Sequence, residues 1–179
     1  MIFHETKIKN VFIIEPELIK DERGFFARMW CAKEFENHGL NPNLSQISVA
    51  FNSKKHTLRG MHYQQEPHEE AKLVRCTSGS IYDVVVDLRV NSKTFKEWLS
   101  IELSANSHKM IYVPEGCAHG YITLEDNTEV IYQMSTFYSP NHYAGIRWND
   151  PTFNISWPFC ENLIISEKDK SYPDFKIIT

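Results

Sequence analysis

Hydrophobic and polar residues alternate in many short stretches of the chain, and this pattern predicts β-strands. Leu99, Ile101 and Leu103 alternate with Ser100 and Glu102, which is the period of two that a half-buried strand shows. Further strands are expected at fairly even spacing, over residues 71–89, 109–116, 118–138 and 145–150. Many short strands of this kind indicate a sandwich or a barrel, so we expect an all-β fold.

Turn-forming residues separate these expected strands. They lie at residues 78–79, 114–116 and 125–127, where glycine, proline, asparagine or aspartate interrupts the alternation. No internal repeat, low-complexity stretch or Gly/Ser-rich linker divides the chain. We therefore expect residues 1–179 to form a single domain.

Helix is expected in only two places. Residues 32–38, with the sequence AKEFENH, predict a short helix that Gly39 ends, with Pro42 just beyond. The segment 163–173, LIISEKDKSYP, predicts a tail packed on the barrel, with a short helix over 166–170 as the alternative.

The composition is that of an ordinary soluble globular protein, with 42% hydrophobic and 23% charged residues. The net charge of -4 is spread along the chain without a basic run, which argues against nucleic-acid binding. No stretch approaches the ~20 apolar residues of a membrane span. The cysteines form no C-x-x-C pair, so we expect reduced thiols and a cytoplasmic protein; they are Cys31, Cys76, Cys117 and Cys160.

His62 is the first candidate for chemistry, within T-L-R-G-M-H-Y-Q at 57–64. On an extended strand it would share a face with Leu58 and Gly60, and Gly60 would let a ligand or another strand come close. A histidine inside a barrel can act as a base near neutral pH. Taken alone, however, a buried histidine is more often structural.

A second histidine, His119, ends the motif P-x-G-x-x-H at 114–119, which resembles half of the metal-site pattern of the cupin superfamily. The other half, H-x-H on an earlier strand, is missing, because Tyr63 and Gln64 follow His62. A divalent metal needs several converging ligands, so we expect no metal. We expect the remaining potential ligands to lie in a solvated loop; they are His68, Glu69 and Glu70.

Three further residues look ordinary by themselves. Alternation places Tyr132 on one face with Val130 and Met134, where a tyrosine is usually core, although it can also deliver a proton. Position alone favours a surface role for Lys72 and a solvated charge for Asp169.

Near the N-terminus, D-E-R-G-F-F at 21–26 combines an arginine with two aromatic residues, which suits phosphate binding and base stacking.

Together these segments resemble the dTDP-4-dehydrorhamnose 3,5-epimerase family from about residue 10 to residue 170. The resemblance implies a cupin-type jelly-roll barrel, usually a homodimer, that acts on a nucleotide-linked 4-keto-6-deoxy sugar without metal or organic cofactor. The blocks that carry it, in chain order, are D-E-R-G-F-F, T-L-R-G-M-H-Y-Q, A-K-L-V-R-C, D-V-V-V-D-L-R, P-E-G-C-A-H-G, Y-x(5)-Y-S-P, W-N-D-P and S-E-K-D.

The resemblance also implies roles for single residues. His62 matches the family's base, Asp169 the carboxylate that orients it, and Tyr132 the acid on the opposite face of the sugar. Lys72 matches the residue beside the keto oxygen, and His119 a second active-site histidine. Other residues match positions in the nucleotide and diphosphate cleft: Arg23, Phe26, Gln46, Arg59 and Tyr138.

Two positions depart from the family pattern. Arg28 stands where family members usually carry a glutamate near the thymine, and Tyr143 stands where they usually carry a carboxylate. The resemblance leads us to expect a dTDP-linked substrate. GDP is the main alternative, because an arginine could face the O6/N7 edge of guanine, and CDP is a weaker one.

This set of residues fits proton transfer beside a ketone. A keto group at C4 acidifies the protons on C3 and C5, and an enolate forms that a nearby cation stabilises. The sequence leaves open whether C3, C5 or both are inverted. Rival interpretations are a metal-dependent cupin, a sugar-nucleotide 3,4-ketoisomerase and a non-catalytic sugar-binding barrel.

Overall fold

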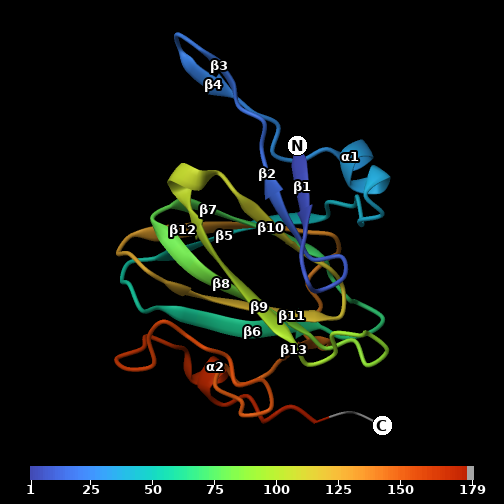
Figure 1. The fold of residues 1–179 in the computed structure, drawn as a ribbon. Helices are drawn as coiled ribbons and strands as arrows, with labels where there is room; N and C mark the ends of the chain where they lie inside the picture. The colour runs from blue at the N-terminus through green and yellow to red at the C-terminus, as the bar shows by residue number, and fades with distance from the viewer. Residues whose placement is uncertain (177–179) are drawn as a thin grey trace.

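The computed structural model describes residues 1–176, and most of its regular structure is antiparallel β-sheet (Figure 1). One sheet has six strands, in the spatial order β1 (Ile2–Glu5), β2 (Phe12–Glu15), β10 (Met110–Val113), β7 (Lys72–Ser78), β12 (Thr128–Met134) and β5 (Gln46–Asn52). The other has five, in the order β13 (Tyr143–Gly145), β6 (Leu58–Gln64), β11 (Cys117–Thr123), β8 (Ser80–Asp87) and β9 (Trp98–Ser104).

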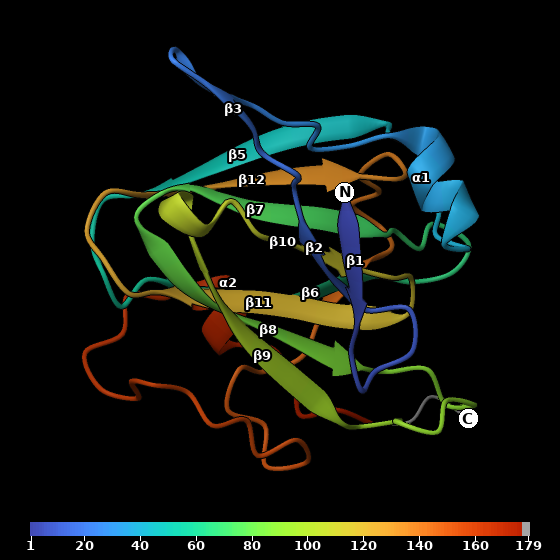
Figure 2. The same cartoon turned by 45° about the horizontal axis from the view of Figure 1, so that its top comes forward.

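The two sheets face each other and enclose the main core, as Figures 1 and 2 both show. Val74 and Val130 from the six-stranded sheet pack with Val85 and Tyr121 from the five-stranded one. Burial of such apolar area is the main force that closes the sheets on each other. The all-β prediction and the jelly-roll barrel that the family resemblance implied are both confirmed.

The chain after β13 covers the outer face of the five-stranded sheet (Figure 1). Val84 and Val86 of β8 point outward into this second core, where they pack with Phe153 and Trp157. Both faces of β8 are covered, which fits the uninterrupted apolar run at residues 84–86 of this strand. The expected tail on the barrel is confirmed, and within it the alternative of a short helix is the one observed, as α2 (Glu167–Lys170).

The remaining elements are short. Helix α1 (Ala32–Asn37) lies where it was expected, and Gly39 follows it with a φ of +68°, a conformation that glycine adopts without steric cost. A 3-10 turn, η1 (Ala105–Ser107), follows β9. Strands β3 (Ile19–Asp21) and β4 (Gly24–Phe26) form a separate hairpin that projects from the barrel (Figure 1).

One expected strand was misplaced. Instead of residues 145–150, the strand β13 covers Tyr143–Gly145, and the following residues form a turn closed by a hydrogen bond from the Asp150 N–H to the Arg147 carbonyl. In the described part of the chain, no helix is long and apolar enough to cross a membrane.

Candidate active site

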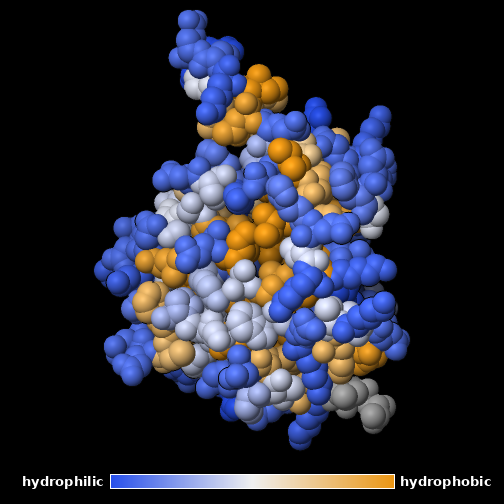
Figure 3. Space-filling model, in the orientation of Figure 1, coloured by the Kyte–Doolittle hydropathy of each residue, from blue (hydrophilic) through white to orange (hydrophobic). Residues whose placement is uncertain are grey.

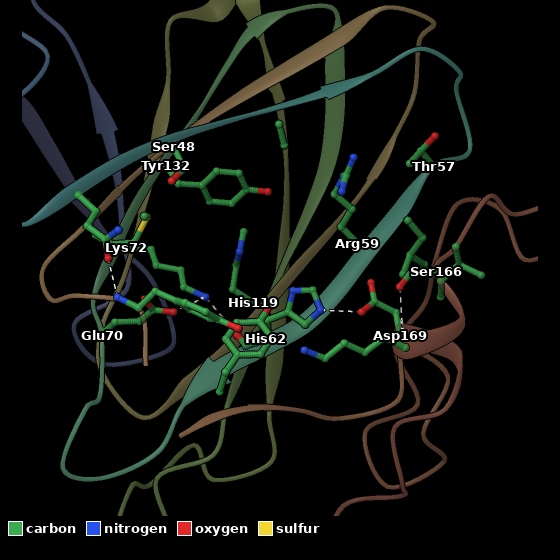
Figure 4. Close-up of a pocket in the computed structure, with 18 of the residues that line it drawn as sticks. Ser48, Thr57, Arg59, His62, Glu70, Lys72, His119, Tyr132, Ser166 and Asp169 are labelled. Carbon is green, nitrogen blue, oxygen red and sulfur yellow. Dashed lines mark hydrogen bonds and ion pairs between the residues drawn. The ribbon is translucent and has the colours of Figure 1, made fainter. Parts of the chain in front are cut away.

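A cavity of about 660 Å³ opens between the two sheets (Figure 4). This volume is within the range of small-molecule sites. Its walls contain nine of the twelve residues that the sequence singled out; they are His62, Lys72, Asp169, Tyr132, His119, Gln46, Arg59, Tyr138 and Tyr143.

His62 and Asp169 form a hydrogen-bonded pair at the edge of this cavity. The Nε2 atom of His62 lies 2.8 Å from Oδ1 of Asp169, and the Gly60 N–H donates to Oδ2 of the same carboxylate at 3.2 Å. Helix α2 holds Asp169 there, and the Ser166 hydroxyl accepts a bond from the Asp169 N–H at its start. Asp169 is 5% exposed, so it is not the solvated charge that its local sequence suggested.

The electrostatics of this pair suit a base. Burial lowers the pKa of His62, while the bond to Asp169 and its charge work in the opposite direction. Burial works to raise the pKa of Asp169, but the His62 bond and charge and the Gly60 N–H hold that pKa below its usual range. A neutral imidazole beside a charged carboxylate keeps one nitrogen free to accept a proton.

The alternation expected along β6 is wrong. Arg59 and His62, three residues apart, both line the cavity. Met61 packs in the outer core, and Leu58 borders both the cavity and that core. The β6–β11 register shifts between these two positions, so the strand does not keep a strict period of two.

Gly60 lies at this shift and packs against β11. A Cβ atom there would lie 2.6 Å from the Cα of Gly120, and the φ of Gly60 is +130°. The close approach expected at Gly60 is thus made by a neighbouring strand.

Tyr132 faces the cavity from β12, on the sheet opposite His62. Its ring packs edge-on against His119, with centroids 6.1 Å apart. Burial, and after it the neighbouring Tyr121, raise the pKa of Tyr132 well above its ordinary value. The hydroxyl therefore stays protonated at neutral pH, which is the state that an acid needs.

Lys72 enters the cavity from β7 and is 8% exposed, so the surface role that its position favoured is wrong. Its ammonium lies 3.1 Å from the Glu70 carboxylate and donates to the His62 carbonyl at 3.3 Å. Glu70 was expected in a solvated loop, but its side chain is only 8% exposed and lines the cavity. His68 is exposed, as expected.

His119 forms a second histidine–carboxylate pair. Its Nε2 atom lies 2.8 Å from Oδ2 of Asp83 on β8. Both side chains are buried, with exposures of 3% and 0%. The sequence analysis assigned Asp83 no role: it begins the block D-V-V-V-D-L-R, but before three valines it looks like a polar position in a core strand.

Polar and aromatic residues line the mouth of the cavity. The Nε atom of Arg59 donates to Asn52 at 2.8 Å, which fixes the guanidinium beside the opening. Tyr138 packs edge-on against Tyr143, with centroids 5.3 Å apart, and the ammonium of Lys168 lies 4.4 Å from the Tyr143 ring centroid. A cation over a tyrosine ring is an attractive contact, so Tyr143, where the resemblance led us to expect a carboxylate, is held beside a lysine.

The three remaining predicted residues do not reach the cavity of their own chain. Arg23 pairs with Asp21 at the tip of the hairpin, Phe26 is 71% exposed, and Arg28 pairs with Glu34 at 3.1 Å. The hairpin that carries Arg23 and Phe26 points away from the barrel (Figure 1). Figure 3 shows apolar residues where it joins the barrel. Their role in nucleotide binding stays a prediction.

No group of three or more His, Cys, Asp and Glu side chains within residues 1–176 is arranged to hold a metal ion. The two cavity histidines each bind a carboxylate instead. Proton transfer is the chemistry that this arrangement suits directly: two histidines, a tyrosine and a lysine face one cavity from opposite walls.

Comparison with known proteins assigns the chain to a family. The family model described as dTDP-4-dehydrorhamnose 3,5-epimerase matches residues 5–176. The protein of that name from Salmonella typhimurium is 40% identical over 174 residues, which cover 97% of this chain and 94% of the relative. The one from Sinorhizobium fredii is 39% identical over 173 residues, covering 97% and 89%.

Solved structures agree with these matches. The epimerase from Elizabethkingia anophelis superposes with a TM-score of 0.95 at 39% identity, over 98% of this chain and 96% of that one. The Legionella pneumophila enzyme, in complex with dTDP-4-keto-L-rhamnose, has a TM-score of 0.91 at 34% identity, over 99% and 94%. The chain belongs to the dTDP-4-dehydrorhamnose 3,5-epimerase family.

Proposed function

We propose that this epimerase inverts C3 and C5 of a dTDP-linked 4-keto-6-deoxy sugar, of the dTDP-4-dehydro-6-deoxyglucose type. The observation that carries the proposal is that His62 and Tyr132 face one cavity from opposite sheets. Inversion of a carbon requires a proton to leave on one face and a proton to return on the other. A base and an acid on opposite walls meet that requirement.

Each inversion then has two steps. His62 takes the proton from the carbon beside the ketone, and the electron pair of the C–H bond moves to the C4 oxygen as an enolate. The Lys72 ammonium stabilises that oxygen. Tyr132 returns a proton to the carbon from the opposite face, and the ketone re-forms. Asp169 keeps the ring nitrogen of His62 that faces the cavity free to accept the proton.

We propose dTDP as the nucleotide on the support of the relatives, one of which was solved with dTDP-4-keto-L-rhamnose. Arg59 offers a cation for the diphosphate, and Tyr138, 53% exposed, offers a ring on which a base can stack. Calorimetric titration with free dTDP, GDP and CDP tests this. We expect dTDP to bind most tightly, and tightest binding of GDP would instead support guanine recognition by Arg28.

Inversion at C3 alone is the alternative reaction. A 3'-monoepimerase from Streptomyces bikiniensis, solved with dTDP-quinovose, superposes with a TM-score of 0.88 at 28% identity. The two reactions thus share one barrel. NMR of the product formed in deuterated water separates them, because deuterium at both C3 and C5 identifies the double epimerase.

We also propose that the working form is a homodimer. Strand β5 is the last strand of its sheet, and its outward residues are strongly exposed: Ile47 by 61%, Val49 by 62% and Phe51 by 57%. An apolar strip of this kind on a sheet edge favours association. A second copy seated there would also bring a projecting hairpin, with Arg23 and Phe26, toward this chain.

The substitution Val49→Arg tests this interface. It places a charge in the proposed apolar contact, so we expect the dimer to dissociate in light-scattering measurements at concentrations where the unmodified protein is dimeric. Val90→Arg is the matched control, because Val90 is 58% exposed and lies away from β5. A monomeric unmodified protein, or an intact dimer in Val49→Arg, would contradict the proposal.

The pH dependence tests the role of the His62–Asp169 pair. Protonated His62 cannot accept a proton, so kcat/KM should fall as the pH drops through a pKa below 6.5, the side to which burial shifts this group. Asp169 opposes that shift. Asp169→Asn should therefore move the acid limb to lower pH and reduce the plateau by about two to four orders of magnitude.

Glu167→Gln provides the control for this profile. Glu167 lies on the same helix but is 90% exposed on its side chain and pairs with Lys170. We expect the acid limb and the plateau of kcat/KM in Glu167→Gln to match those of the unmodified enzyme. An acid limb that stays in place in Asp169→Asn would count against direct coupling of Asp169 to the base.

We further propose a cytoplasmic location, in keeping with the four cysteines, all of which are free thiols. Burial raises the pKa of Cys76 to about 11 and that of Cys117 to about 12, so these two stay protonated and unreactive. Cell fractionation with an antibody to the protein tests the location.

A further inference from the structure

Two histidine–carboxylate pairs enter the cavity side by side. His62 and His119 are direct cross-strand partners on β6 and β11, and each Nε2 atom lies 2.8 Å from its carboxylate, Asp169 or Asp83. Figure 4 shows both rings on the same wall, with His119 directed toward Tyr132. By these distances alone the two pairs would have the same chemistry.

The second oxygen of each carboxylate separates the two pairs. In Asp169, Oδ2 accepts the Gly60 N–H at 3.2 Å. In Asp83, Oδ1 is buried and has no hydrogen-bond partner within residues 1–176. Asp83 is also the more deeply buried of the two, with 0% exposure against 5% for Asp169.

This difference decides how many protons each pair keeps. A charged carboxylate is destabilised when one of its buried oxygens accepts no hydrogen bond. The Asp83–His119 pair therefore favours the state that holds an additional proton. Accordingly, burial raises the pKa of Asp83 although His119 and Lys72 oppose the shift. The pKa of Asp169 lies below its usual range, because the His62 bond and charge and the Gly60 N–H outweigh burial.

We propose that Asp83 is a positioning residue: its pair with His119 retains one proton more than a carboxylate and a neutral imidazole, so that His119 presents an N–H at Nδ1. The proton can sit on the carboxyl group and be donated to Nε2, or sit on Nε2 and be donated to the carboxylate. In both arrangements Nδ1 carries a hydrogen. His119 is then a hydrogen-bond donor, while His62 beside it is an acceptor.

A donor at His119 has a use in the proposed reaction, on which this inference rests. The Lys72 ammonium is already paired with the Glu70 carboxylate at 3.1 Å, so part of its charge is compensated before substrate arrives. An N–H on the neighbouring wall can share the developing charge on the enolate oxygen. Two similar pairs would thus take opposite roles because their carboxylates have different surroundings.

The direct test is the protonation state of the His119 ring in the unmodified protein. Long-range ¹H–¹⁵N NMR at neutral pH distinguishes a protonated from a bare ring nitrogen, and the signals that disappear in His119→Gln are those of His119. We expect Nδ1 of His119 to be protonated and Nδ1 of His62 to be bare. A bare Nδ1 at His119 would overturn the proposal.

Substitutions at Asp83 give a second, functional test. The amide in Asp83→Asn can donate to Nε2 and so preserve the N–H at Nδ1; we expect kcat within about threefold of the unmodified enzyme. Asp83→Leu has similar volume but no donor, and its kcat should fall about a hundredfold. If folded Asp83→Asn lost as much catalytic activity as Asp169→Asn, that result would contradict the proposal.

Asp87→Asn is the control on the same strand. The Asp87 carboxylate accepts bonds from Arg89, Ser92 and Thr94 rather than from a histidine, so we expect the His119 ring signals to stay unchanged. If Asp83→Leu does not fold, the NMR of the unmodified protein and of Asp83→Asn still decides. The NMR measurement of the His119 ring does not depend on turnover, so it tests the protonation of the pair by itself. The proposed reaction is tested separately: activity that survives in His62→Ala would contradict it.

Discussion

Replacing His62 with alanine is expected to reduce kcat by about 10²- to 10⁴-fold, the usual contribution of a positioned general base. The imidazole lies 2.8 Å from Asp169 and is the group of this pair that can accept a proton at neutral pH. Its removal should also stop exchange of substrate hydrogens with solvent. Turnover measured by NMR of the product, with substrate above KM, checks both expectations.

His4→Ala is the matched control for this variant. The His4 side chain is 48% exposed and lies 3.5 Å from Glu15 on the first two strands. We expect normal turnover and normal exchange from it. Undiminished activity in His62→Ala, with the protein folded, would rule out His62 as the base.

Replacing Tyr132 with phenylalanine is expected to separate exchange from inversion. His62 remains in place, so the carbon beside the ketone still loses its proton and can regain a solvent-derived one on the same face. The acid on the opposite face is missing, so formation of the inverted product should fall by about 10²- to 10⁴-fold. NMR in deuterated water reports the two quantities in one experiment.

Tyr82→Phe removes a tyrosine hydroxyl from outside the cavity. That hydroxyl donates to the Ser156 carbonyl at 3.0 Å, so its loss should leave both exchange and inversion unchanged. Equal losses of exchange and inversion in Tyr132→Phe would mean that the tyrosine serves proton removal or binding rather than proton return.

Strands with one buried face were well predicted from the sequence. The alternation at Leu99, Ile101 and Leu103 identifies β9, and that at Val130 and Tyr132 identifies β12. In such strands, side-chain polarity is set directly by the face on which each residue lies. That residues 1–179 form a single domain stays a prediction.

Strand β6 shows where local patterns stop being informative. A strict period of two placed His62 with Leu58, but the register shift beside Gly60 turns His62 to the same side as Arg59. The shift lies where Gly60 packs closely on Gly120, a partner far away in the sequence. No window of neighbouring residues contains that information.

The site itself shows the same limit. Asp169 lies 107 residues from His62 in the chain, and its local sequence is that of an exposed turn. Glu70 precedes β7, Lys72 is the first residue of that strand and Asp83 lies within β8; the closed barrel buries all three side chains. The family resemblance supplied the roles of Asp169 and Lys72, whereas the place of Glu70 and Asp83 in the site emerged from the structure alone.

The most direct test of the central claim, proton transfer by His62 and Tyr132 across the cavity, is a single NMR experiment. The enzyme is incubated in deuterated water with a dTDP-linked 4-keto-6-deoxy sugar, and the product is examined at C3 and C5. We predict one deuteron at each inverted carbon, with incorporation lost in His62→Ala and inversion alone lost in Tyr132→Phe. Inverted product that retains the original hydrogen at C3 and C5 would contradict the account.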